Sequence, residues 1–144
     1  MENSFLSSDE TDLKSDFISA CRNEHHSQVP VWFMRQAGRS LPEYKKIRGE
    51  GSILEAASDP ERAAQITLQP VERYGVDAAI LFSDIMVPVH SIDFGVEIQP
   101  GIGPVVENPF KSIEDLKRLR ALEPEVDVPY VGETIKILHR ECPV

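Results

Sequence analysis

The chain has 144 residues, of which 41% are hydrophobic, and it carries a formal net charge of −9 at pH 7. This length and hydrophobic content suffice for one buried core. The acidic balance makes nucleic acid and anionic membrane surfaces poor candidates for partners.

The cysteines and the hydropathy pattern exclude further classes of protein. Cys21 and Cys142 form no CxxC pattern, so we expect neither a disulfide framework nor a zinc site. The amino terminus lacks the basic and apolar regions of a secretory signal. No apolar run approaches the roughly 18 residues that a membrane span requires. We therefore expect a cytoplasmic protein that binds no metal and does not contact a membrane.

Residues 1–27 are predicted to form a polar N-terminal extension. They are rich in acidic side chains and carry no recognisable motif, although Ser15 to Cys21 has enough apolar residues for a short helix. We place a single domain over residues 28–144, which contain every motif described below.

The first predicted strand of this domain covers Val31–Gln36. Its apolar residues lie between Pro30 and Gly38, and a short apolar run bounded in this way is typical of a buried strand. In this interpretation Trp32 is a core residue.

Two arginines follow this strand and are the first candidates for a binding site. Arg35 and Arg39 are separated by Gln36, Ala37 and Gly38. A guanidinium group is always charged and matches the geometry of carboxylate or phosphate, so the pair can bind an anionic ligand. The Cα atoms of the two arginines are at most about 14 Å apart. The alternative is that both arginines form ordinary surface salt bridges.

A connection over residues 40–58 leads to a helix with clear boundaries. Asp59 is the predicted N-cap, Pro60 the first helical residue and Gly75 the residue that ends the helix. Pro70 lies inside the helix and is expected to kink its last turn.

The segment Asp77–Ile85 is predicted to be a second strand. Its nearly continuous apolar run suits a strand of a parallel sheet that is buried on both faces. Strand, helix and strand in this order indicate an α/β protein. Asp84 would then stand at the carboxyl end of the strand, either as a functional carboxylate or as a loop cap or arginine partner.

Three further elements are predicted after the second strand. Val87–Val106 is rich in proline and glycine and indicates a hairpin. Ser112–Leu122 is predicted as a helix capped by Ser112 and Asp115, ended by Pro124, and with three apolar residues facing inward: Ile113, Leu116 and Leu119. A last amphipathic helix is defined by its apolar spacing: Tyr130, Val131, Thr134, Ile135 and Leu138.

Four sequence motifs together resemble the amino-terminal part of the uroporphyrinogen decarboxylase family. They are MRQAGR at residues 34–39, LPEY at 41–44, DAAILFSDI at 77–85 and PGIGP at 100–104. The resemblance extends from about Pro30 to the end of the chain. It departs at Ser40, where many family members have an aromatic residue.

The resemblance implies a (β/α)8 TIM barrel, of which this chain would be the amino-terminal part. A whole barrel typically needs about 250 residues, more than this chain has. We therefore expect a piece of a longer protein, ending near the start of another strand at Pro143.

The resemblance also implies a reaction and the residues that perform it. Family enzymes remove CO2 from the four acetate side chains of uroporphyrinogen III and give coproporphyrinogen III, without a cofactor. The aspartate matching Asp84 accepts hydrogen bonds from the pyrrole N–H groups. A carboxylate in that position stabilises the cationic ring formed when a pyrrole carbon is protonated. Arg35 and Arg39 would each pair with a substrate carboxylate, with Arg35 near the path of proton transfer.

The resemblance also has implications for the turn that joins the two arginines and for the oligomeric state. Gln36, Ala37 and Gly38 would contribute backbone contacts to the substrate. Family enzymes form homodimers, so we expect the full-length protein to do the same.

Two other interpretations stay open at the level of sequence. One is a relative on the same barrel that transfers methyl groups from a corrinoid and uses zinc. The other is that the 144-residue chain is a partial barrel that only binds the substrate or associates with other chains, without catalysis.

Overall fold

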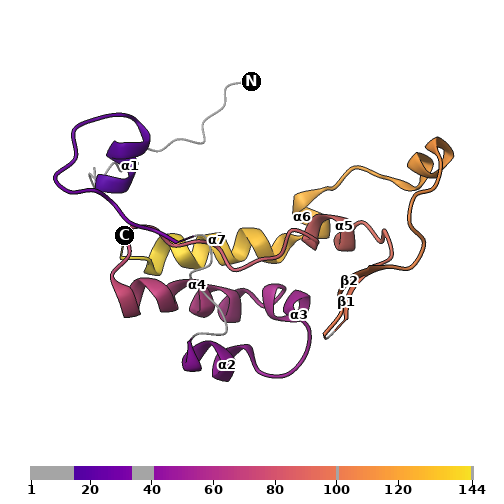
Figure 1. Ribbon diagram of the computed structural model, residues 1–144, viewed down its shortest axis with the longest axis horizontal. Helices are drawn as coiled ribbons and strands as arrows, with labels where there is room; N and C mark the ends of the chain where they lie inside the picture. Colours follow the sequence, from indigo (N-terminus) through magenta and orange to yellow (C-terminus); the bar gives the residue numbers. More distant parts are fainter. Residues whose placement is uncertain (1–14, 34–40, 100, 144) are drawn as a thin grey trace.

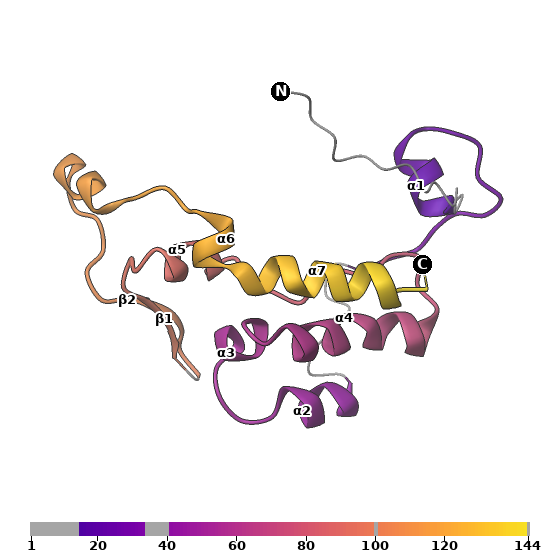
Figure 2. The ribbon, with the colours of Figure 1, turned by 180° about the vertical axis from the view of Figure 1, so that it is seen from behind.

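The computed structural model describes residues 15–33, 41–99 and 101–143. Its elements are α1 (Asp16–Cys21), α2 (Pro42–Arg48), α3 (Ile53–Ala57), α4 (Pro60–Tyr74), α5 (Val87–Ser91), β1 (Val96–Gln99), β2 (Gly103–Val106), the 3₁₀ helix η1 (Ile113–Arg118), α6 (Pro124–Asp127) and α7 (Pro129–Glu141). The molecule is elongated, with α4 and α7 side by side in its middle (Figure 1 and Figure 2). None of the described helices is both long and apolar enough to cross a bilayer.

Helix α4 has the boundaries that the sequence predicts. The Asp59 side chain accepts a hydrogen bond from the Arg62 backbone N–H at 3.1 Å, and Pro60 is the first helical residue. Gly75 ends the helix in the left-handed conformation, with φ of 61°. Pro70 lies inside the helix and is buried. Helix α4 packs against α7 on one side and against α2 and α3 on another.

Helix α7 confirms the predicted last helix, with one correction to its buried face. Thr134 and Ile137 are the buried residues, whereas Ile135 is 52% exposed. The face that packs on α4 is therefore rotated from the one we expected.

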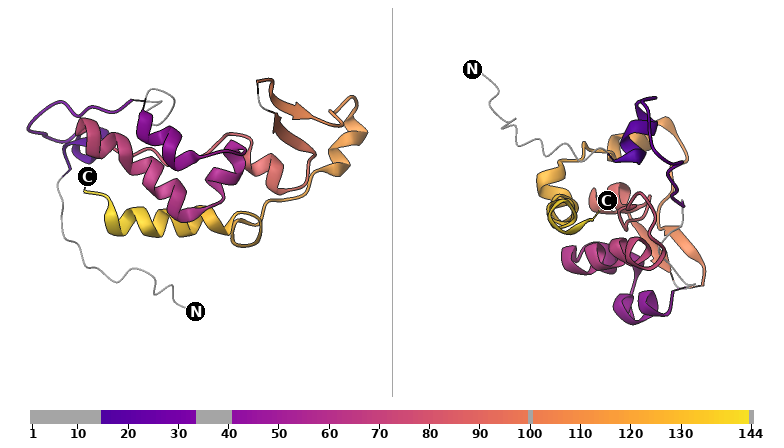
Figure 3. Two further views of the ribbon diagram at one scale, coloured as in Figure 1. Left: turned by 90° about the horizontal axis from the view of Figure 1, so that it is seen from below. Right: turned by 90° about the vertical axis from the view of Figure 1, so that its left-hand side faces the viewer.

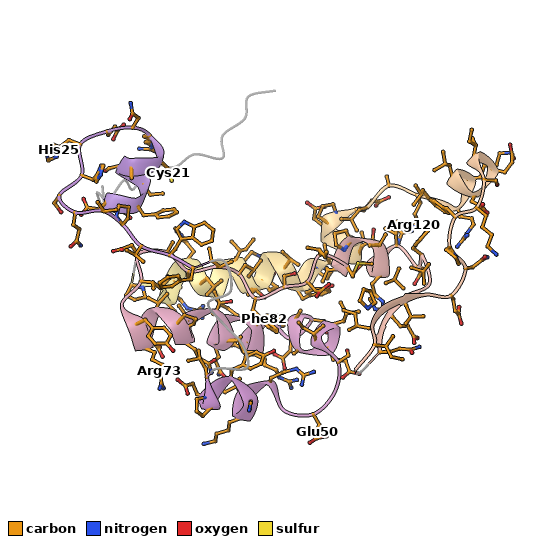
Figure 4. The ribbon with its side chains drawn as sticks, in the orientation of Figure 1. Cys21, His25, Glu50, Arg73, Phe82 and Arg120 are labelled. Atoms are coloured by element: carbon orange, nitrogen blue, oxygen red, sulfur yellow. The ribbon has the colours of Figure 1, made fainter. Side chains whose placement is uncertain are left out.

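The predicted connection over residues 40–58 contains two short helices. Leu41 directly precedes α2 and is fully buried in a core cluster with Tyr44 and Ile66. Arg73 of α4, labelled in Figure 4, donates a 2.6 Å hydrogen bond to Glu43 of α2 and so ties the two helices together. Helix α3 begins with a capping box, and the whole connection is packed onto α4.

The predicted strands are not formed as β-strands in the described residues. Residues 31–33 and 77–84 run without regular secondary structure, although the Asp77 backbone N–H donates to the Val31 carbonyl at 2.8 Å. Trp32 is 43% and Phe33 58% exposed, so the expectation that they are buried is wrong. The reason is that no described element covers their outer face, and the strands of a parallel sheet are buried only where both faces of the sheet are covered.

The hairpin predicted within Val87–Val106 is present as strands β1 and β2. They pair antiparallel, with Val96 opposite Val106 and Gln99 opposite Gly103. Gly101 has a φ of 77° in the turn, where glycine is the residue that adopts such an angle without strain. The sequence did not predict α5, which precedes the hairpin.

The predicted helix Ser112–Leu122 is shorter and more exposed than expected. The capping box of Ser112 and Asp115 is confirmed, but only the 3₁₀ helix η1 follows it. The three residues expected to face inward are exposed: Ile113 (82%), Leu116 (51%) and Leu119 (45%). Figure 3 shows that η1 and the hairpin lie beyond the end of α4 and α7, away from the helices that bury the core of the described chain.

Pro124 begins α6 rather than ending a longer helix. At the opposite end of the molecule, α1 confirms the predicted helix from Ser15 to Cys21 within one residue. Its Asp16 carboxylate accepts hydrogen bonds from the backbone N–H groups of Ser27 and Gln28. These contacts hold the end of the predicted extension against its helix.

Candidate functional site

Asp84 stands at the end of the extended segment that follows α4. It is half-buried, and its Oδ1 accepts a hydrogen bond from the Met86 backbone N–H at 2.8 Å. Its carbonyl oxygen accepts a second bond from Val87 N–H at 3.1 Å, where α5 begins. The loop-cap interpretation is therefore correct for one carboxylate oxygen. Within the described residues Oδ2 has no hydrogen-bond partner, so it can accept from a ligand.

The chain just before Asp84 is fixed to the helices. The Phe82 backbone N–H donates to Thr67 Oγ1 of α4 at 2.8 Å. The Phe82 ring, labelled near the centre of the molecule in Figure 4, meets the Tyr44 ring edge-on with centroids 6.0 Å apart. It packs on the cluster that contains Leu41. The direction of the chain entering Asp84 is thus set by α2 and α4.

The two extended segments are joined where they begin. Val31 N–H donates to the Asp77 carboxylate at 2.7 Å, and Asp77 N–H donates to the Val31 carbonyl at 2.8 Å. In Figure 1 both segments run from this pair toward the middle of the molecule. This is the orientation of neighbouring strands in a βαβ unit.

The predicted cationic part of the site lies outside the described residues. Arg35, Gln36, Ala37, Gly38 and Arg39 all fall within residues 34–40. Their contact with Asp84 therefore stays a prediction. The described neighbours of this stretch are Phe33 before it and Leu41 after it.

The cationic residues that follow in α2 do not converge on Asp84. Lys45 and Lys46 are exposed, and Arg48 donates to the backbone carbonyls of Gly49 and Gly51, the second at 2.6 Å. They form a charged face of α2 and the loop after it.

A cavity of about 530 Å³ lies elsewhere, between α3, α5, β1 and the start of α7. Its lining includes four acidic side chains: Glu55, Asp93, Glu97 and Asp127. His90 and Tyr130 also line it. No local sequence pattern indicates this cavity, because its residues come from elements far apart along the chain.

Asp127 is the most strongly held carboxylate of this cavity. Arg120, labelled in Figure 4, donates to both of its oxygens at 2.7 Å, and Glu123 N–H donates at 2.8 Å. These bonds, the side-chain bond from Arg120 foremost, lower the pKa of Asp127 to about 2. Both oxygens of this carboxylate therefore already accept a hydrogen bond from Arg120.

No group of three or more histidine, cysteine or acidic side chains in residues 15–33, 41–99 and 101–143 is arranged to hold a metal ion. The expectation of a metal-free protein stays a prediction.

The described chain is a mixed α/β protein in which an extended segment, anchored on a helix, ends in a carboxylate with one oxygen available. Comparison with known proteins identifies its family. The model of the family described as uroporphyrinogen decarboxylase (URO-D) matches residues 12–144, so the match begins inside the predicted extension. The chain belongs to the uroporphyrinogen decarboxylase family.

Curated relatives carry the same name. The uroporphyrinogen decarboxylase of Geobacillus kaustophilus is 54% identical over 129 residues, which are 90% of this chain and 37% of the relative. That of Thermobifida fusca is 56% identical over 127 residues, or 88% of this chain and 35% of the relative. The Geobacillus thermodenitrificans protein is 51% identical over 90% of this chain and 37% of its own length. The chain thus spans little more than a third of these relatives.

Proposed function

We propose that the protein containing this chain is a uroporphyrinogen decarboxylase, a carboxy-lyase that needs no cofactor. It converts uroporphyrinogen III to coproporphyrinogen III by removing CO2 from four acetate side chains. The observation that carries the proposal is the identity of about half the residues to named decarboxylases, over about nine-tenths of this chain.

The proposed site combines Asp84 with the arginines of the preceding segment. Arg39 is two residues before Leu41 in the sequence, and Asp84 is two residues after Phe82. Because Leu41 and Phe82 belong to one packed cluster, and both segments start together at Val31 and Asp77, a shared site is sterically reasonable. In it, Arg35, Gln36, Ala37, Gly38 and Arg39 bind substrate carboxylates, and Arg35 also takes part in proton transfer.

Asp84 supplies the charge that the reaction needs. Protonation of a pyrrole carbon makes the ring cationic, and the ring then accepts the electron pair left by departing CO2. A carboxylate held toward the pyrrole N–H groups stabilises the cationic ring more than the neutral ring of the bound substrate. This difference lowers the barrier to the reaction. Asp84 suits this role because its turn fixes one oxygen and leaves the other available to a ligand.

We also propose the larger assembly that the family resemblance implies. The two extended segments would be neighbouring strands of a (β/α)8 barrel, residues 28–144 its amino-terminal part, and residues 1–27 an extension. The whole protein would be a cytoplasmic homodimer. The shared start of the segments and their position over α4 and α7 support the barrel arrangement (Figure 2).

The test is an anaerobic assay of the full-length protein with uroporphyrinogen III. We expect coproporphyrinogen III and partly decarboxylated intermediates, at a rate unchanged after dialysis against a chelator. Absence of decarboxylated products would contradict the proposed activity, and loss of activity on dialysis would contradict its independence from metal.

A further inference from the structure

Thr67 makes the one hydrogen bond, among those of the described residues, that joins α4 to the backbone just before Asp84. Its hydroxyl donates to the Ala63 carbonyl at 2.7 Å and accepts from Phe82 N–H at 2.8 Å. Thr67 is 1% exposed. Both roles of the hydroxyl are thus used inside the core, where an unpaired partner is costly.

The other bonds around Asp84 are local. Asp84 Oδ1 and its carbonyl oxygen bind the N–H groups of Met86 and Val87, which shape the turn but do not attach it to another element. The contact between the Phe82 and Tyr44 rings is apolar, so it holds the segment less directionally than a hydrogen bond does. Thr67 therefore determines how far along α4 the segment lies, and with it the position of the Asp84 carboxylate.

We infer that Thr67 is a positioning residue for Asp84, acting through the Phe82 backbone. The inference rests on the catalytic role proposed for Asp84. Its chemical basis is the sensitivity of such reactions to placement, since a displacement of about 1 Å can reduce a rate about a hundredfold. Thr67 does not touch the substrate, so its loss should lower kcat and leave KM nearly unchanged.

Thr67→Val in the full-length enzyme tests the inference, because valine keeps the shape and removes the acceptor for Phe82 N–H. We expect kcat to fall about tenfold with KM within about twofold of wild type. Thr67→Ser keeps the hydroxyl and should restore most of kcat.

Thr134 in α7 offers a matched control. It is also 1% exposed, and its hydroxyl donates to the Tyr130 carbonyl at 2.7 Å in the same pattern. In the described chain it accepts no backbone N–H. Thr134→Val should therefore lose a similar helix bond and keep kcat near wild type.

A double-mutant cycle with Asp84→Asn separates positioning from general destabilisation. If Thr67 acts through Asp84, Thr67→Val should reduce kcat much less in the Asp84→Asn enzyme than in wild type. An equal reduction in both, or equal losses in Thr67→Val and Thr134→Val, would overturn the inference.

The cycle also distinguishes this inference from the proposed function. If Asp84→Asn has low activity and Thr67→Val has wild-type activity, only the role of Thr67 is overturned. Wild-type activity of Asp84→Asn overturns both. If Thr67→Val does not fold, Thr67→Cys, whose thiol is a weaker acceptor, should show the same fall in kcat at unchanged KM, and its absence would count against the inference.

Discussion

Asp84 is oriented by its own turn, independently of any ligand. The bond from Met86 N–H to Oδ1 uses one oxygen and fixes the plane of the carboxylate. The cap and the functional interpretations of this residue are therefore compatible, because a carboxylate has two oxygens and several acceptor sites. Sequence alone presented them as alternatives.

Asp84→Asn should separate charge from shape in the full-length enzyme. The amide oxygen of asparagine can still accept from Met86 N–H, so the turn is retained while the negative charge is lost. We expect kcat to fall by about two orders of magnitude. Asp93→Asn, an exposed acid before the hairpin, is the control and should keep wild-type turnover. Turnover of uroporphyrinogen by Asp84→Asn at the wild-type rate would contradict its role.

Asp127 should make a pH-dependent contribution to stability. Its pKa is about 2 in the folded protein, below the ordinary 3.8, so the unfolded chain binds the proton more tightly. The contribution is complete above about pH 5 and is lost as the pH falls from about 4 toward 2. Carboxyl titration by NMR should give a midpoint near 2, and Arg120→Ala should raise it toward the ordinary value. An unchanged midpoint in Arg120→Ala would contradict the assigned cause.

The elements that the sequence predicted correctly are those with local signals. Helix α4 is defined by Asp59, Pro60 and Gly75, and the hairpin by glycines at its turn. These residues act through their own backbone geometry, so a pattern over a few residues is sufficient. The cap of η1 was predicted for the same reason.

The elements that were not predicted depend on distant partners. Ile113 and Leu116 were expected to face a core, but both are exposed, because no described element packs over η1 at its end of the molecule. Trp32 and Phe33 are exposed for a related reason. The spacing of apolar residues predicts which of them share a face. It does not predict whether another element covers that face, because this depends on the tertiary structure. The sequence places Asp84 at the end of its segment, but no local pattern reveals the anchor of that segment on Thr67.

Two glycines give a matched test of helix geometry. A Cβ at Gly75 or at Gly132 meets no atom within 4 Å, so neither substitution is crowded. Gly75 has a φ of 61° at the end of α4, whereas Gly132 lies inside α7. Gly75→Ala should lower the free energy of unfolding by about 1 kcal/mol, and Gly132→Ala should raise it by a similar amount. Denaturant unfolding measures both, and a change of the same sign in the two variants would contradict these backbone assignments.

At the scale of the whole molecule, the two extended segments carry exposed apolar side chains, which we call the open face. Four of its residues are at least 38% exposed: Val31, Trp32, Phe33 and Ile80. Ile85, directly after the second segment, is 90% exposed. The segments have α4 and α7 on one side (Figure 3). The part that matches this chain is 37% of the Geobacillus kaustophilus relative, so most of that relative lies outside the match. Such a face favours association when it is left open.

The 144-residue chain by itself should therefore associate and should not decarboxylate uroporphyrinogen. Its extended segments carry exposed apolar side chains, and the wall of the site opposite Asp84 would have to come from residues that this chain lacks. Sedimentation of the purified chain should show species larger than a monomer at micromolar concentration. Ile80→Gln should reduce that association more than Ile113→Gln, because Ile113 lies in η1, away from the open face.

The activity of the chain is measured in the same anaerobic assay as that of the full-length protein. We expect no coproporphyrinogen III above the level of a blank without protein. A monomeric chain with turnover near that of the full-length enzyme would show that these residues suffice for catalysis, and the interpretation of the open face as the place of missing barrel strands would then be wrong.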